Sequence, residues 1–353
     1  MMLFFVIVLV LAVGLLQHRM AANSLESVRE EYYPDGAVVE IGEEFHLVIR
    51  LENAGRRYLP FVRVQMDLPW VQDLNAKVMT VKRSTWLKPH EQIEFKIPLS
   101  VSARGRYVMP GLEISCGDFL GLKEKKRTLE RFHEIVVPPR ETGILEIETV
   151  LGGFLGDRSV RRFLYEDPVL TAGYREYTGR EPMKMISWKQ SSRGQGLVVK
   201  TCDHTVEPMV SVLLNTDGRK RKNTELLEVC FSLARTVCGI LEEKGISYDF
   251  SMNAMMAGLS TEPDELREGL GSRHFSRILE CLGRATGEVT SSWPVFLERA
   301  AGKGMMRARI LITVDDEAEN TPVLARLREA SGGNLLVLQA SCWMGSREAE
   351  VER

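Results

Sequence analysis

Oxygen-bearing side chains follow two apolar, strand-like runs in the C-terminal half of the chain. Asn215 and Asp217 come directly after the run at 210–214, and Asp315 comes after the run that begins at Ile310. In an open α/β sheet, the carboxyl ends of the strands form the usual ligand-binding edge. Carboxylate and amide oxygens are the ligands that a hard divalent cation prefers. These residues could therefore serve a metal-dependent hydrolase.

A second interpretation of the same positions needs no metal. Asn and Asp are frequent at helix N-termini and in turns, where their side chains accept backbone N–H groups. Arg219 also follows the first run, and it would place a fixed positive charge where the cation should bind. We favour this second interpretation, and no metal or other cofactor is predicted.

Other enzymatic motifs are missing from the sequence. The six histidines are isolated and form no HExxH motif, and no G-x-S-x-G nucleophile elbow occurs. Gly302 and Lys303 lack the upstream glycine and the following Ser or Thr of a P-loop. The chain is therefore predicted not to be an enzyme.

Charge and cysteine content narrow the remaining function classes. The 353 residues carry a net charge of −2, so no global electrostatic field directs the protein to nucleic acid. The six cysteines are scattered and have no CxxC spacing for zinc, which favours buried free thiols over a disulfide framework. Proteins are the expected partners.

The most unusual local composition lies in residues 174–200. This segment holds six basic and two acidic residues around one tryptophan, Trp188. Pro182 suits the first position of a helix, and the apolar run at 197–199 could pair as a strand beside the α/β sheet. We predict that the segment is a structural joint between two domains, with Trp188 buried.

The alternative for this segment is a docking face for a partner protein. In that case the basic side chains of Arg180, Lys184 and Lys189 would lie in solvent, where they could contact the partner.

The first sixteen residues form an unbroken apolar run. A helix of that length spans about 24 Å at 1.5 Å per residue, slightly less than a hydrocarbon core. No basic residue precedes the run, which matches an anchor better than a cleaved signal peptide. We therefore predict a membrane anchor helix at 1–20, inserted through residues 1–16. Arg19 and Arg29 follow the span, so the soluble domains of this single-pass protein are expected in the cytoplasm.

Periodicity divides the rest of the chain into three parts. Residues 36–140 contain short alternating runs, such as Val62, Val64 and Met66, which indicate a small β-sandwich domain. Residues 141–205 form a connecting segment. In residues 206–345, apolar strands alternate with helical patterns, which predicts an open, mostly parallel α/β sheet.

Glycines are expected to loosen the backbone of the connecting segment before its signature part begins. They stand at positions 152, 153 and 156.

Residues 174–200 resemble the signature of the bacterial domain-of-unknown-function 58 family. That signature reads R-E-Y, a Gly-Asp pair, R-x-I-D-W-K-x-x-A-R and an apolar strand. The corresponding residues here are Arg175, Glu176, Tyr177, Glu181, Trp188, Lys189 and Arg193. Two turns of the family's β-domain, R-G-R-Y and D-P-F-G-L, resemble further residues, namely Arg104, Gly105, Tyr107, Gly117, Asp118 and Gly121.

The resemblance implies an architecture and a partner, but no reaction. Family members look like membrane-anchored proteins with a β-domain, the signature segment and a von Willebrand factor A-like α/β domain. They are commonly associated with MoxR-type AAA+ ATPases, which implies a role in chaperone-like or envelope assembly. The metal site of type A domains, D-x-S-x-S, corresponds here to Asn215, Asp217 and Arg219, a poor match that argues against metal binding.

Together these observations predict a non-enzymatic, membrane-anchored scaffold or adaptor. It is expected to act with a MoxR-type AAA+ ATPase and other proteins, and not with nucleic acid. The alternative is a metal-dependent hydrolase that uses the strand-end carboxylates of Asp217 and Asp315.

Overall fold

The computed structural model describes most of the chain beyond residue 24. The described residues are 4, 8, 25–70, 79–117, 124–160, 171–179, 183, 186–192, 196–202, 209–218, 223–258, 265–303, 307–314 and 322–344. They belong to two compact units. The first consists of Met1–Arg140, Met256–Thr261 and Leu279–Thr286, and the second of Glu141–Met255, Glu262–Ile278 and Gly287–Arg353.

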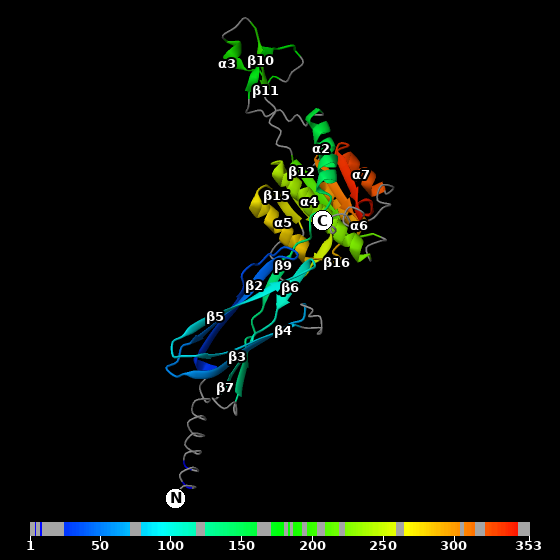
Figure 1. The fold of residues 1–353 in the computed structure, drawn as a ribbon. Coiled ribbons are helices and arrows are strands. Elements are labelled where there is room, and N and C mark those ends of the chain that lie inside the picture. Colours follow the sequence, from blue (N-terminus) through cyan, green and yellow to red (C-terminus); the bar gives the residue numbers. More distant parts are fainter. Residues whose placement is uncertain are drawn as a thin grey trace. The chain divides into compact units, whose positions relative to one another are not determined.

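The first unit contains antiparallel strands in three sheets (Figure 1). After a 3-10 turn, η1 (Leu25–Ser27), the first sheet has the order β1 (Val28–Pro34), β2 (Glu44–Asn53), β5 (Gln92–Ser100). The second has the order β4 (Met79–Leu87), β3 (Leu59–Leu68), β7 (Glu113–Gly117), β8 (Glu124–Thr128). The third pairs β6 (Gly105–Met109) with β9 (His133–Val137).

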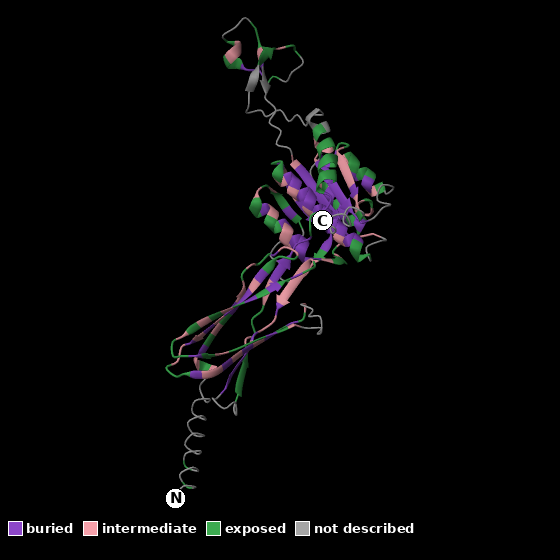
Figure 2. Cartoon of the chain, viewed as in Figure 1, coloured by how far each residue is buried: buried purple, intermediate pink, exposed green. Residues whose placement is uncertain are grey.

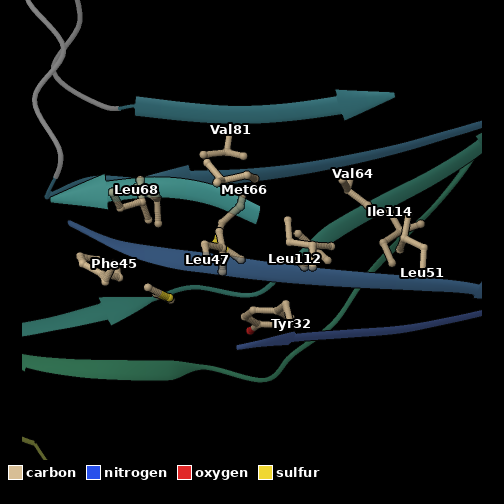
Figure 3. Packing of buried hydrophobic residues seen from close by; sticks show 14 of the residues in the cluster. Tyr32, Phe45, Leu47, Leu51, Val64, Met66, Leu68, Val81, Leu112 and Ile114 are labelled. Carbon is tan, nitrogen blue, oxygen red and sulfur yellow. The ribbon is translucent and has the colours of Figure 1, made fainter. Parts of the chain in front are cut away.

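Alternating side chains build the core of this unit. Val62, Val64 and Met66 are buried on one face of β3, as the sequence pattern predicts, because successive side chains of a strand point to opposite faces. Leu47 from β2 belongs to the same cluster of buried side chains. Figure 3 shows Leu47 and Met66 lying close together between their strands. One apolar cluster therefore joins the first two sheets.

The second unit contains a five-stranded sheet with helices packed on it. The strand order is β15 (Glu265–Gly269), β13 (Ser247–Met252), β12 (Met209–Asn215), β17 (Ala308–Thr313), β18 (Leu335–Gln339). All neighbours are parallel except β15, which runs antiparallel to β13. Buried residues are concentrated in these strands (Figure 2), as expected for a sheet covered on both faces.

Five helices longer than one turn are described wholly or partly in this unit, one before the strands of the sheet and four between or beside them in sequence. They are α2 (Ile144–Val160), α4 (Thr224–Glu243), α5 (Ser272–Arg284), α6 (Trp293–Gly302) and α7 (Pro322–Ala330), with a final 3-10 turn, η4 (Ala340–Trp343). Asn223 caps α4, since its side-chain oxygen accepts the Glu225 and Leu226 N–H groups. The last residues of α5 belong to the first unit.

Two small sheets complete the described elements. β10 (Thr171–Glu176) pairs antiparallel with β11 (Val198–Cys202), beside the one-turn helix α3 (Trp188–Ser191). β14 (Ala254–Met256) pairs with β16 (Ala285–Val289).

The predicted fold class needs correction. It placed a membrane helix ahead of a small β-sandwich and a von Willebrand factor A-like sheet. Instead, strands predominate in the described part of the chain and are divided among six sheets. No helix described there is long and apolar enough to cross a membrane, which contradicts the predicted single-pass membrane localisation. Almost all of the predicted anchor, residues 1–20, lies outside the described residues.

Two predictions for the connecting segment were also wrong. The glycines at 152, 153 and 156 lie inside the 17-residue helix α2, because burial of Ile147 and Leu151 outweighs their low helix propensity. The apolar run at 197–199 does not join the five-stranded sheet. It pairs with β10, where Val199 is buried.

Candidate functional site

Three buried polar side chains meet at the carboxyl ends of β12, β13 and β17. Asn215 is the last residue of β12 and pairs in register with Thr313, the last residue of β17. Asn253 follows the end of β13. All three side chains have no exposed surface. The parallel arrangement brings them together, because the ends of parallel strands share one edge of the sheet.

These side chains bond to one another. The Asn253 Nδ2 donates to the Asn215 Oδ1 at 2.7 Å, and the Asn215 Nδ2 donates to the Thr313 Oγ1 at 3.0 Å. The Thr216 N–H and hydroxyl donate to the Asn253 Oδ1 at 2.8 and 3.1 Å. Both amide oxygens therefore already accept hydrogen bonds from protein groups. Such satisfied networks fix one arrangement of a buried polar site.

Asp217 is engaged with the helix that follows. Its Oδ2 accepts the N–H of Trp293, the first residue of α6, at 2.9 Å. The N-cap residue Ser292 makes no side-chain capping bond, so Asp217 satisfies one of the helix's open donors from a distant part of the sequence. The helix N-terminus in turn favours a negative charge at this point.

This arrangement bears on the predicted strand-end site. Among the residues that the structure describes, no three His, Cys, Asp or Glu side chains are grouped to hold a metal ion. Arg219 and Asp315 lie outside the described residues. The described residues form a polar cluster. In it the amides of Asn215 and Asn253 hold the strand ends together, and the carboxylate of Asp217 holds the N-terminus of α6.

Those signature residues that the structure describes lie on or beside the small sheet of β10 and β11 and on its helix α3. Arg175 and Glu176 are exposed on β10, and Tyr177 follows them, half-buried. Lys189 is exposed on α3. Glu181 and Arg193 lie outside the described residues.

Trp188 is exposed and not buried as predicted, with 60% of its surface accessible. The helix α3 is a single turn that begins at Trp188, and the buried residues of this stretch are Ile186 and Ser187, just before the helix. Ile186 is buried and bridges to the buried Val199 of β11. The small core of this sheet is therefore filled without the indole.

Further apolar side chains of the same segment are exposed. They are Tyr174, Met183 and Leu197. The described part of 171–202 thus combines exposed aromatic and apolar side chains with exposed basic ones, which matches the docking alternative better than a buried joint.

The β-domain signature residues have structural surroundings. The Arg104 guanidinium donates to the backbone oxygens of Leu282 and Ala285 at 2.6 and 2.7 Å, within the first unit. The Tyr107 hydroxyl donates to the Ala103 oxygen at 2.8 Å. Gly105 has a φ of 151°, a conformation that favours glycine.

The other β-domain signature residues are Gly117, Asp118 and Gly121. Gly117 is the last residue of β7, whereas Asp118 and Gly121 lie outside the described residues.

Sequence reasoning missed a charged cluster in the first unit. The Glu134 carboxylate accepts from the Arg106 Nε at 2.6 Å and also from Arg284. Burial alone would raise the pKa of Glu134, but the bonds from Arg284 and Arg106 outweigh it and lower the pKa. Spacing gives no signal for this cluster, because its members are far apart in the sequence.

A second missed group lies half-buried on the five-stranded sheet. The Asp249 carboxylate accepts from the Ser211 hydroxyl at 3.0 Å and from Arg307 at 3.1 Å. Burial raises the pKa of Asp249 in spite of these partners. Ser211 and Asp249 are register partners on neighbouring strands. The alternating pattern of β12 and β13 does not predict that these two side chains share a face, because that also requires the register between the strands.

Four of the cysteines are buried free thiols, as predicted: Cys116, Cys230, Cys238 and Cys281. Cys342 is exposed, which corrects the prediction at that position. Burial raises the pKa of the Cys116 thiol to about 12, so this thiol is unreactive at neutral pH.

No family model and no curated protein matches the sequence. Solved structures show weak likenesses. The CARDB domain of the PF1109 protein from Pyrococcus furiosus, in complex with di-metal ions, is 13% identical over 31% of this chain and 86% of its own, with a TM-score of 0.23.

Two further structures match smaller parts of their own chains. The alkylpurine DNA glycosylase AlkC of Pseudomonas fluorescens is 14% identical over 31% of this chain and 30% of its own, with a TM-score of 0.23. The β-glucosidase EmGH1 of Erythrobacter marinus is 16% identical over 29% and 15%, with a TM-score of 0.19. At such TM-scores these likenesses assign neither fold nor function to the chain.

Proposed function

We propose that the chain is a non-catalytic scaffold or adaptor that binds partner proteins through residues 171–202. The observation that carries this proposal is the 60% exposure of Trp188, next to the exposed Lys189. Exposed apolar patches, more than single side chains, mark interaction sites, and Tyr174, Met183 and Leu197 of the same segment are exposed as well. Tryptophan and tyrosine are also enriched among the residues that contribute most to binding protein partners.

The partner we propose is a MoxR-type AAA+ ATPase. The support is the resemblance of Arg175, Glu176, Tyr177, Trp188 and Lys189 to the signature of a family associated with such ATPases. Exposed Tyr174, Met183 and Leu197 in the same segment add apolar surface that a partner could cover.

The polar cluster at the strand ends supports a binding role over a catalytic one. The amides of Asn215 and Asn253 are hydrogen-bonded to protein groups, and the carboxylate of Asp217 accepts from α6. Such bonds hold the strand ends and the helix in fixed positions, which suits a rigid recognition module.

The test is the affinity of the full chain for a purified MoxR-type AAA+ ATPase, measured by biolayer interferometry. Trp188→Ala should weaken binding by about tenfold or more, as expected for a central aromatic contact. Phe132→Ala is the matched control, because Phe132 is an aromatic side chain of nearly equal exposure, 58%, in the first unit. It should change the affinity less than twofold.

Two results would count against the proposal. If the wild-type chain bound no such ATPase, the proposed partner would be wrong. If Trp188→Ala bound as tightly as the wild type, the proposed surface would be wrong.

A further inference from the structure

Two loops of the first unit are joined by one buried side chain. Residues 54–58 connect β2 to β3, and residues 88–91 connect β4 to β5. Asn53 has no exposed surface, and its Nδ2 donates to the Arg57 oxygen at 2.7 Å and to the Lys88 oxygen at 2.9 Å. The Asn53 backbone N–H donates to the Glu91 backbone oxygen, and the Asn53 backbone oxygen accepts the His90 N–H, both at 2.9 Å. The two loops therefore form one ordered surface.

This surface presents two aromatic rings. Tyr58 is 38% exposed and Trp86, at the end of β4, is 47% exposed. Their ring centroids lie 5.8 Å apart with 30° between the ring planes. Rings that are already ordered against each other lose little conformational freedom when a partner covers them.

Basic side chains lie on the same two loops. Arg56, Arg57 and Lys88 are exposed, and the Lys88 Nζ lies 5.4 Å from the Trp86 ring centroid. The two loops contain one carboxylate, that of Glu91, and it accepts the Lys88 N–H at 2.7 Å within the turn. The surface is therefore aromatic and predominantly positive, although the whole chain has a net charge of −2.

We propose that this surface, formed by Arg56, Arg57, Tyr58, Trp86 and Lys88, binds an acidic segment of a partner protein. Carboxylates of the segment would pair with the arginines and the lysine, and an apolar side chain would pack on the Trp86 ring. Trp, Tyr and Arg are the residue types that dominate protein-binding hot spots, and the positive charge selects an acidic partner.

Single-stranded nucleic acid is the competing class of ligand, since it also uses aromatic rings and basic side chains. The charge of the chain favours the protein segment, because nucleic-acid binding usually depends on an extended basic surface and the net charge here is −2. This inference rests on the proposed role as an adaptor, but it concerns a different unit of the chain and a different surface.

The test uses fluorescence polarisation with three labelled probes and the full chain. The first probe is an eight-residue peptide of Asp and Glu with one central Leu. The second has Lys in place of each acidic residue, and the third is an oligothymidylate of sixteen nucleotides. We expect saturable binding of the acidic peptide that weakens as salt is added, and no binding of the basic peptide.

Variants locate the binding. Lys88→Glu and Trp86→Ala should each weaken binding of the acidic peptide by about tenfold. Lys96→Glu makes the same charge change on β5 and should leave the affinity within twofold, because Lys96 lies outside these loops. Lys88→Glu changes an exposed side chain, so it keeps the test decisive if Trp86→Ala fails to fold.

Several outcomes would overturn the inference. The first is no binding of the acidic peptide, and the second is a wild-type affinity for it in both Lys88→Glu and Trp86→Ala. The third is binding of the basic peptide as tight as that of the acidic one, and the fourth is displacement of the acidic peptide by the oligothymidylate. Trp188→Ala should leave acidic-peptide binding unchanged. If the acidic peptide did not bind, the proposed ATPase binding through Trp188 would be unaffected. If the ATPase did not bind, the proposed acidic-peptide binding would be unaffected.

Discussion

Asp217 stands where the sequence suggests a cation ligand, and its carboxylate accepts the Trp293 N–H of α6. A capping contact and a metal site make different demands on this residue. As a cap, Asp217 contributes to stability whether or not a cation is present. As a metal ligand, it would make stability depend on the cation concentration, because a ligand that binds only the folded state stabilises it.

We predict that Asp217→Ala lowers the free energy of unfolding by about 0.5–2 kcal/mol, the range for loss of a capping side chain. Adding Mg²⁺ should not change the melting temperature of either protein. Urea unfolding and thermal melts with and without Mg²⁺ check both points. A saturable Mg²⁺ stabilisation that the wild type shows and the variant lacks would instead support the hydrolase alternative.

At this scale the sequence could identify Asn215 and Asp217 but not their partners. Asn253 and Thr313 are 38 and 98 residues from Asn215, and only strand pairing brings them together. Trp188 shows the opposite difficulty. A single tryptophan in a polar segment suggests burial, yet the small sheet fills its core with Ile186 and Val199.

Elements were more predictable than residue contacts. The apolar run at 210–214 is strand β12, and the helical spacing at 226–241 is helix α4, which ends just before Gly245. These patterns are strong because burial fixes their period. Short or edge elements carry less pattern, so β15, with one buried residue in five, was missed.

The helix α2 was missed for a different reason. Glycine is a poor helix former, since it loses the most conformational freedom on folding. In α2 the buried Ile147 and Leu151 supply the packing that offsets this cost. Replacing one of these glycines by a better helix former should therefore stabilise the protein.

Gly153→Ala should raise the free energy of unfolding by about 0.5–1 kcal/mol, because alanine is the better helix former. A Cβ at Gly153 would meet no atom within 4 Å. Gly245 provides the contrasting control, because its φ of 65° follows the end of α4 and favours glycine. Gly245→Ala should lower stability. Urea denaturation of both variants measures the two effects, and a destabilised Gly153→Ala would show that α2 is not a regular helix there.

At the scale of the whole molecule, the units do not follow the order of the sequence. The first unit includes Leu279–Thr286, which comes more than a hundred residues after its last strand. Periodicity cannot predict such a contribution, because it detects elements and not which core they join. The continuous part of the first unit ends at Arg140, and the later segment joins it from a distant part of the sequence.

The later segment supplies Arg284, whose guanidinium pairs with the Glu134 carboxylate and whose side chain is almost fully buried. Arg284→Met removes this hydrogen bond to a charged group, but Arg106 still donates to the partly exposed Glu134 carboxylate. We therefore predict that Arg284→Met in the full chain lowers the stability of the first unit by about 1.5–3 kcal/mol, the range for a hydrogen bond to a charged group.

Urea unfolding followed by tryptophan fluorescence measures the first unit when Trp188, Trp293 and Trp343 of the second unit are replaced by phenylalanine in all the proteins compared, because Trp70 and Trp86 are then the remaining tryptophans. Arg277→Met is the control, because Arg277 lies on the same helix α5 but in the part assigned to the second unit. If Arg284→Met and Arg277→Met altered this transition equally, the segment would not be part of the first unit's stability. A transition that only Arg284→Met shifts would show that the first unit needs residues beyond 140 to reach its full stability, so an isolated fragment ending there would be the less stable form.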